Sequence, residues 1–140
     1  TFDIICLFQV LDHMPDPVGT LSECQKLLSP KGVILILNHD IEAWSAKLLG
    51  ESSPIIDIEH TYLYSKQTLA KILEVAGLKA VEQGCAWNSY DISNLIKLFP
   101  FPKFIKSFIL FLFKVTLLGK VPVRVPLGNL YSLSVKKQEL

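Results

Sequence analysis

The feature that most constrains this chain is a pair of continuous apolar runs separated by one helical stretch. The first run occupies residues 2–9, and the second, VILIL, occupies residues 33–37. Runs without polar alternation are typical of strands buried on both faces, as in a parallel sheet. Between them, Asp16 is suited to cap a helix and Pro17 to occupy its first turn. The pattern predicts a strand, a helix over about 17–28 and a second parallel strand, joined by a right-handed crossover.

The remainder of the chain predicts further elements of the same α/β class. Residues 43–49 are suited to a short helix, and a longer helix is expected to begin after Ser65 and to end at Gly77. Two further strands are expected at 79–87 and 130–135. The last of these alternates polar and apolar residues, as an edge or antiparallel strand does.

An apolar segment at residues 95–126 interrupts this pattern. Five lysines are spread through it, at positions 97, 103, 106, 114 and 120. Its proline-free part, 104–118, is shorter than the roughly 20 residues that a membrane-spanning helix needs. Three interpretations stay open: a helical lid over a pocket for a hydrophobic acceptor, an interfacial helix with its lysines at lipid headgroups, or a surface that packs on the sheet or on a second subunit.

Composition excludes some classes of function. The chain has 140 residues, which suits one domain, and half of them are hydrophobic. A net charge of +1, without interleaved basic and aromatic residues, gives no reason to expect a nucleic-acid partner. Cys6, Cys24 and Cys85 form no CxxC pair, so we expect buried, reduced thiols rather than a disulfide framework. With no signal-peptide pattern visible, the expected location is cytoplasmic.

Strand direction points to a candidate site. Ligands of open α/β sheets bind beyond the carboxyl ends of the strands. Polar residues follow both apolar runs at that rim, namely Gln9, Asp12 and His13 after the first and Asn38, His39 and Asp40 after the second. The spacing of His13, His39 and His60 matches no common metal-ligand pattern, so we expect no metal.

Several stretches resemble, in the same order, the second half of class I S-adenosylmethionine-dependent methyltransferases of the type 11 and ubiquinone-biosynthesis kind. They are FDII at 2–5, VLDHMPDP at 10–17, LSPKG at 28–32, VILIL at 33–37, HTYLYSKQTLAKILEVAGLKAVE at 60–82 and GNLYSLSVKK at 128–137. The resemblance implies a partial Rossmann-like sheet of about four strands with flanking helices. The strand order would be first, second, fourth and third, with the last strand antiparallel.

The resemblance also implies S-adenosylmethionine as cofactor and methyl transfer to a small-molecule or lipid-like acceptor. The reaction would be an in-line displacement at the sulfonium by an oxygen, nitrogen or carbon nucleophile. The family's glycine-rich GxGxG loop and its ribose-binding acid are absent from the sequence. Residues 1–140 are therefore identified as the C-terminal part of one methyltransferase domain, with 95–126 as an apolar lid or interface insertion. We expect these residues to bind the cofactor weakly and to be inactive alone.

Site residues are carried over from the family position by position. The cofactor side takes Leu7, Phe8, Gln9, Val10 and His13, and the substrate side takes Asn38, His39, Trp44 and His60. His13 and His39 are the candidate general bases, because an imidazole titrates near neutral pH. Each also has a structural interpretation, His13 as a packing residue at the helix start and His39 as part of a solvated loop.

Two rival interpretations remain open. In the first, the chain is a non-catalytic dimerisation or membrane-interaction module, in which the apolar segment mediates a homodimer or a peripheral membrane contact. In the second, a similar sheet serves a nucleotide-sugar or nicotinamide enzyme. A strand ending in GxGxG upstream of residue 1 would favour the methyltransferase.

Overall fold

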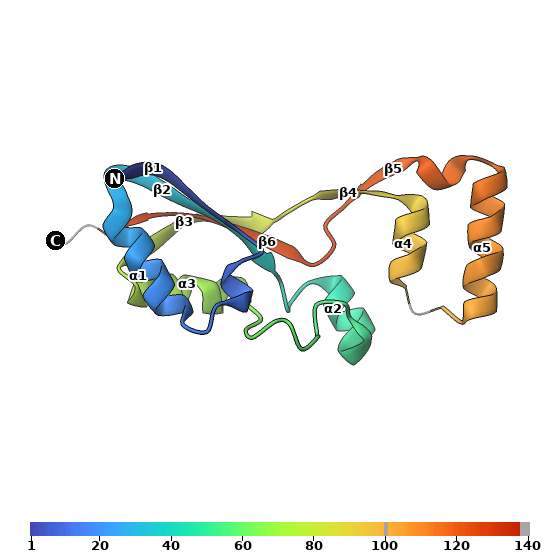
Figure 1. Cartoon of the computed structure of the whole chain (residues 1–140), viewed down its shortest axis with the longest axis horizontal. Helices are drawn as coiled ribbons and strands as arrows, with labels where there is room; N and C mark the ends of the chain where they lie inside the picture. Colours follow the sequence, from blue (N-terminus) through green and yellow to red (C-terminus); the bar gives the residue numbers. More distant parts are fainter. Residues whose placement is uncertain (100, 138–140) are drawn as a thin grey trace.

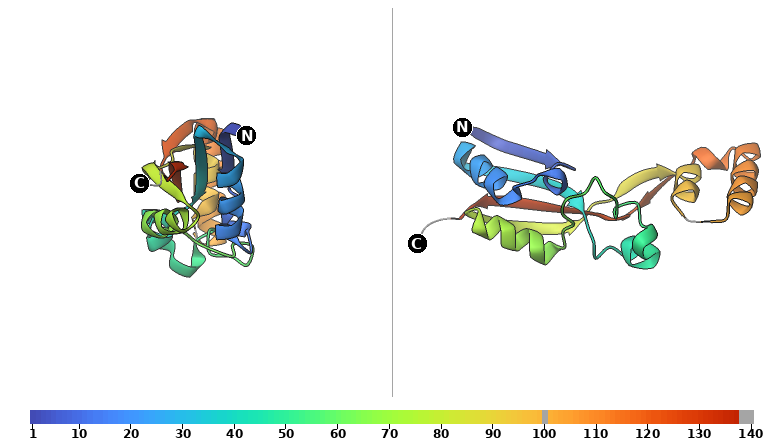
Figure 2. Two further views of the ribbon diagram at one scale, coloured as in Figure 1. Left: turned by 90° about the vertical axis from the view of Figure 1, so that its left-hand side faces the viewer. Right: turned by 60° about the horizontal axis from the view of Figure 1, so that its bottom comes forward.

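The structure, a computed structural model, describes residues 1–99 and 101–137. A four-stranded mixed sheet forms its centre, and two helices lie along one face of that sheet (Figures 1 and 2). This arrangement confirms the predicted α/β class.

The order of the strands confirms the prediction as well. β1 (Phe2–Phe8) pairs in parallel with β2 (Leu28–His39). β6 (Asn129–Lys136) runs antiparallel to both β2 and β3 (Leu78–Cys85), which gives the order β1-β2-β6-β3. Because β6 is antiparallel, its first residue lies beside the last residue of β2, with Asn129 opposite His39.

β2 begins earlier than the sequence predicted. It was expected over 33–37, yet pairing already starts where Leu28 lies opposite Phe2. The register then shifts before Ile4 pairs with Val33. At Gly32, a side chain would meet the backbone oxygen of Phe2 at 3.0 Å, so only glycine allows the two strands to approach this closely.

The helix that joins the first two strands, α1 (Pro17–Leu27), starts where its capping residues predict. The Gly19 N–H donates to the Asp16 carboxylate at 2.8 Å, and Pro17 occupies the first helical position. α1 therefore has a defined start and passes directly into β2.

The second covering helix, α3 (Lys66–Val75), begins with a capping box. The Ser65 hydroxyl accepts from the Thr68 N–H, and the Thr68 hydroxyl accepts from the Ser65 N–H. The helix ends before Gly77, whose φ of +76° is the left-handed conformation that glycine adopts without strain.

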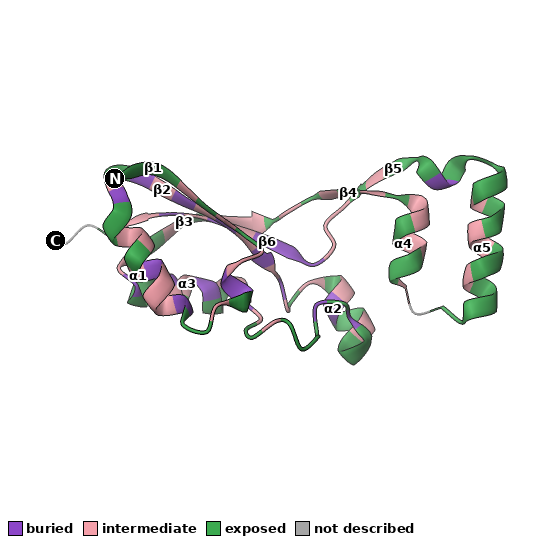
Figure 3. Ribbon diagram, viewed as in Figure 1, coloured by how far each residue is buried: buried purple, intermediate pink, exposed green. Residues whose placement is uncertain are grey.

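The hydrophobic core lies between these two helices and the sheet. Its fully buried members include Leu21, Leu69 and Leu73 from the helices and Ile34, Ile36 and Leu130 from the strands. Burying each such side chain contributes about 1.5–3 kcal/mol. The opposite face of β1 is exposed (Figure 3) and carries Ile4 and Phe8. Cys6 on β1 and Cys85 at the end of β3 are exposed too, so the expectation that these thiols are buried is wrong.

The apolar segment folds into an arm, which we define as residues 88–125. Its base is a two-stranded ribbon in which β4 (Asn88–Asp91) pairs antiparallel with β5 (Pro122–Val125). The ribbon carries α4 (Ile92–Leu98), α5 (Lys103–Val115) and the short helix η3 (Leu118–Lys120).

The arm projects from the main sheet rather than lying on it (Figure 1). α5 packs against α4 and η3. Packing of α5 on the main sheet is therefore not seen, and the lid, the interfacial helix and the contact with a second subunit stay predictions. Within residues 1–99 and 101–137, no helix combines the length and hydropathy required to cross a bilayer.

Candidate functional site

Buried polar atoms without a hydrogen bond gather where β1 and β2 end. Among the described residues, they belong to Gln9, Asp12, Asn38, His39 and His60. Folded proteins leave few buried polar atoms unpaired, because each one costs free energy. Their concentration at one rim of the sheet marks this place as the candidate site.

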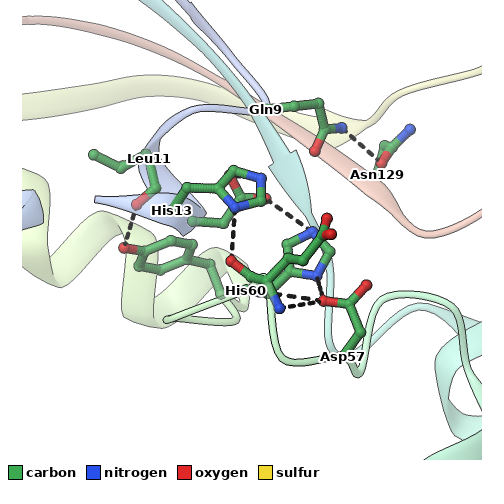
Figure 4. A network of polar contacts seen from close by, with 9 residues as sticks. Gln9, Leu11, His13, Asp57, His60 and Asn129 are labelled. Atoms are coloured by element: carbon green, nitrogen blue, oxygen red, sulfur yellow. Dashed lines mark hydrogen bonds and ion pairs between the residues drawn. The ribbon is translucent and has the colours of Figure 1, made fainter. Parts of the chain in front are cut away.

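Gln9 occupies a strained backbone position directly after β1. Its φ is +52°, a left-handed conformation that is uncommon for a residue other than glycine. Its backbone N–H donates to the Leu37 carbonyl at 2.8 Å, and its side-chain Nε2 donates to Asn129 Oδ1 at 3.1 Å (Figure 4). These bonds hold the strained turn and leave Gln9 Oε1 buried without a partner.

Asp12 is the most deeply buried acid of the site. It lies in the short helix η1 (Leu11–His13) and its side chain has no exposed surface. Its Oδ1 is 3.9 Å from His13 Nε2, and its Oδ2 is 4.0 Å from His60 Nε2. Both separations exceed hydrogen-bond length, so the carboxylate faces two imidazoles without being bonded to either.

Both imidazoles are oriented through their other ring nitrogen (Figure 4). His13 Nδ1 lies 2.7 Å from the Glu59 carbonyl oxygen, which can only accept, so this nitrogen carries the hydrogen. His60 Nδ1 lies 2.9 Å from Asp57 Oδ1 as an ion-pair contact. Burial acts to raise the pKa of Asp57, but the backbone N–H of Glu59 and the neighbouring His60 lower it overall.

His39 completes the cluster from the end of β2. Its ring meets the His60 ring edge to face, with centroids 4.6 Å apart, while the His13 and His60 centroids are 4.9 Å apart. Burial lowers the pKa of His39, and the neighbouring His60 lowers it further, against an opposing effect of Asp12. A neutral imidazole is therefore favoured at His39, as a general base requires.

An apolar cavity of about 140 Å³ opens beside His39. Its polar lining includes His39 and Asn129 from the sheet and Ser45 and Ser53 from the segment after β2. The other wall includes Leu49 from α2 (Trp44–Leu49), Ile55 from the loop that follows, and Tyr90, Leu98 and Phe99 from the arm. The cavity thus suits a ligand with an apolar body and one polar group directed to the histidines.

The structure brings together most of the site residues that the sequence predicted. Those that converge are Gln9, His13, Asn38, His39 and His60. Leu7 packs against the core instead, and Phe8 is exposed on the open sheet face. Val10 is half-buried next to η1. Trp44 is half exposed and borders a separate depression together with Lys47 and Lys66.

Sequence reasoning missed Asn129 and Asp57, whereas Leu98 and Phe99 of the cavity wall lie in the 95–126 segment, for which a lid over an acceptor pocket was one of three interpretations. Asn129 could have been found, because an antiparallel last strand must begin at the rim where the parallel strands end. Asp57 comes from a segment whose sequence carries no strong periodic pattern.

Comparison with known proteins gives a consistent result. A family model described as a methyltransferase domain matches residues 1–83. The ubiquinone biosynthesis O-methyltransferase of Histophilus somni (strain 2336) is 37% identical over 51 residues, which are 35% of this chain and 21% of that protein. The enzyme of the same name from Vibrio cholerae (serotype O1, strain O395) is 24% identical over 98 residues, or 65% of this chain and 39% of that protein.

Solved structures show the same fold. A crystal structure of an S-adenosylmethionine-dependent methyltransferase from Archaeoglobus fulgidus superimposes with a TM-score of 0.56 at 17% identity. The match covers 96% of this chain and 59% of that one. The chain therefore spans only part of the length of the proteins that it matches.

Proposed function

Because the chain belongs to the family of S-adenosylmethionine-dependent methyltransferase domains, we propose that it forms the acceptor side of an enzyme that methylates a small or lipid-like molecule. One observation carries the proposal. His39 lines the apolar cavity and also touches the buried histidine cluster. An acceptor whose apolar body fills the cavity would present its nucleophile to this ring.

The rim residues fit a polar cofactor. Gln9 Oε1 and both amide atoms of Asn38 are buried without partners, and so are available to a ligand's amino-acid end. S-adenosylmethionine supplies a methyl group on a positively charged sulfur. We place Gln9, Val10 and His13 on the cofactor side, while Leu7 and Phe8 stay predictions. Since GxGxG is absent, the glycine-rich part of the cofactor site lies outside these 140 residues in this proposal.

In the proposed reaction, His39 acts as a general base on a hydroxyl acceptor. As the acceptor oxygen attacks, its bond to the methyl carbon forms and the sulfur–methyl bond breaks. The electron pair of the broken bond stays on sulfur, and the hydroxyl proton passes to the imidazole of His39. Holding the reactants in line supplies much of the rate enhancement.

The names of the relatives support a lipid-like acceptor, because they place those proteins in ubiquinone biosynthesis. The test uses the natural protein in which these residues occur, with S-adenosylmethionine and a series of alkylphenols of increasing chain length. We expect methylated product by mass spectrometry, and about a 100-fold lower kcat in His39→Gln, a typical contribution of a general base. The control is Val75→Ala, at an exposed position of α3 that does not line the cavity. Equal activity in His39→Gln and the natural protein would contradict the role of His39.

A second candidate function, peripheral contact with a lipid surface, is favoured by the exposed face of α5. Phe104, Phe108, Phe111 and Val115 follow helical spacing and are all exposed, Phe104 by 76%. Lys103 and Lys114 lie on the same helix beside this stripe, whereas Lys106 turns away from it and donates to the Lys97 carbonyl at 3.0 Å. Aromatic residues bordered by lysines are typical of helices that lie in the interface of a bilayer with anionic lipids.

A further inference from the structure

The imidazole of His39 has one nitrogen atom that is buried without a partner. Among the described residues, no hydrogen bond reaches its Nδ1. We propose that Asn129 is the positioning residue of His39, and that the amide oxygen of Asn129 accepts the hydrogen of Nδ1. Nε2 is then the nitrogen that takes the proton of the acceptor. This last role rests on the proposed function, whereas the pairing of the two side chains does not.

Asn129 is the direct neighbour of His39 in the sheet. β6 runs antiparallel to β2, and the register places Asn129 opposite His39. Side chains of such a pair leave the same face of a sheet, with their Cβ atoms about 4.5–5.5 Å apart. Both residues line the apolar cavity, and Asn129 is only 8% exposed. Its amide is therefore held inside the molecule beside the imidazole.

A hydrogen bond across the end of β2 holds this amide in place. Gln9 Nε2 donates to Asn129 Oδ1 at 3.1 Å (Figure 4). Gln9 follows β1 and Asn129 begins β6, and these are the two strands that flank β2. The bond thus spans the point at which His39 ends its strand. A carbonyl oxygen has two lone pairs, so Oδ1 can accept a second hydrogen from His39.

The electrostatic surroundings of His39 agree with this pairing. Burial lowers the pKa of His39 more than any other effect. The Asn129 side chain and the Gly128 carbonyl act to raise this pKa, because an acceptor of a ring N–H favours the protonated imidazole. The Gly128 carbonyl already accepts from the Asp40 N–H at 2.8 Å. It is the alternative partner of the ring, which the experiment has to separate from Asn129.

The two side chains are adjacent but looser than a full hydrogen bond, since Nδ1 has no partner. Catalytic hydrogen bonds are often long before reactants bind and shorten in the reacting complex. We therefore expect the bond between Nδ1 and Asn129 Oδ1 to be shortest when an acceptor fills the cavity.

The pairing determines which nitrogen of His39 does the chemistry. A neutral imidazole has one N–H and one lone pair, and the partner of the N–H fixes which nitrogen is which. Because Nδ1 is buried, an acceptor in the cavity meets the ring at Nε2. After Nε2 has taken the hydroxyl proton, the ring is positively charged, and the Asn129 oxygen stabilises that charge. The proton passes to water when the product leaves.

The first test locates the hydrogen without measuring activity. The natural protein in which these residues occur is labelled with ¹⁵N-histidine. At about pH 8, above the ordinary pKa of histidine, NMR shows which nitrogen of each neutral ring carries hydrogen. Signals that disappear in His39→Gln belong to His39. We expect Nδ1–H in the natural protein and in Asn129→Asp, which keeps an oxygen in the same place, but a mixture of both forms in Asn129→Leu.

The matched control is Ser53→Ala, which removes another polar group from the cavity wall and should leave His39 in its Nδ1–H form. Circular dichroism shows whether each variant keeps the natural fold. Asn129→Ala, which only removes atoms, is the second variant if the leucine disturbs the fold.

The second test follows methyl transfer to the alkylphenols. Asn129→Leu should lower kcat about 10- to 100-fold, because a reacting group that is held out of position costs this much. Asn129→Asp should restore most of the lost rate, since it keeps the oxygen that faces the ring.

The two tests separate this proposal from the proposed function. If His39 keeps its Nδ1–H form in both Asn129→Leu and Asn129→Ala, the Gly128 carbonyl holds the ring and the role of Asn129 is wrong. Hydrogen on Nε2 in the natural protein would contradict it equally. If the hydrogen moves in the variants while the natural protein methylates no alkylphenol, the pairing is supported and the proposed function alone is in error.

Discussion

The rings of His39 and His60 meet edge to face with an interplanar angle of 89°, although they come from different parts of the chain. His39 ends a buried strand, whereas His60 lies in the irregular segment before α3. This contact joins the rim of the sheet to the loop that closes over it. After burial, the neighbouring His60 is the next cause that lowers the pKa of His39. Both histidines border the space where we place the reaction.

The cavity wall gives a direct test of acceptor binding. Leu49 lines the cavity, while its neighbour Leu48 points to solvent and is 67% exposed. We expect Leu49→Ala to raise KM for an alkylphenol acceptor about 10-fold, because apolar contact in the pocket is lost. KM for S-adenosylmethionine should stay unchanged. Leu48→Ala is the matched control, and an equal effect of both substitutions would argue against this cavity as the acceptor site.

The core makes a second prediction, on stability. Leu73 is fully buried between α3 and the sheet, so Leu73→Ala should lower the free energy of unfolding by about 2–5 kcal/mol. Val75 lies on the same helix and is 67% exposed, so Val75→Ala should change it by less than about 0.5 kcal/mol. Urea denaturation followed by circular dichroism measures both values. Comparable losses in the two variants would contradict the assigned face of α3.

The exposed stripe of α5 makes a third prediction. Vesicles containing phosphatidylglycerol should sediment with the natural protein, and vesicles of phosphatidylcholine alone should retain less of it. Phe104→Ser combined with Phe108→Ser should abolish sedimentation, because it removes the apolar contact and leaves the lysines in place. Light scattering provides the alternative readout. If the protein dimerises through this face and binds neither vesicle type, the face is a subunit interface and the lipid proposal is wrong.

The fourth prediction concerns the cofactor. Residues 1–140 expressed alone should bind S-adenosylmethionine only weakly, because they contain no glycine-rich loop. Isothermal titration should show a dissociation constant above the micromolar range. Circular dichroism of the same sample shows whether the fragment is folded. A folded fragment with micromolar affinity would mean that the rim residues hold the cofactor without that loop.

The sequence predicted the sheet well because its signal is local. Two apolar runs, a capped helix between them and a family resemblance were enough to give the strand order and the rim that carries His39. The approach of His60 to Asp12 could not be predicted, since an irregular segment without periodicity determines it. The two-stranded base of the arm could not be predicted either, because the pairing of Tyr90 with Val123 depends on a register between residues far apart in the chain.

The division of the cavity between two parts of the molecule has a mechanical consequence. His39 and Asn129 in its wall belong to the main sheet, whereas Tyr90, Leu98 and Phe99 belong to the arm, which is attached through a ribbon of four residue pairs. The size of the space open to an acceptor is thus set by the angle at which this ribbon holds the arm. If α5 binds a surface and the arm moves with it, the wall formed by Tyr90, Leu98 and Phe99 moves as well. In our proposal, an acceptor taken from that surface and an acceptor taken from water would therefore meet cavities of different width.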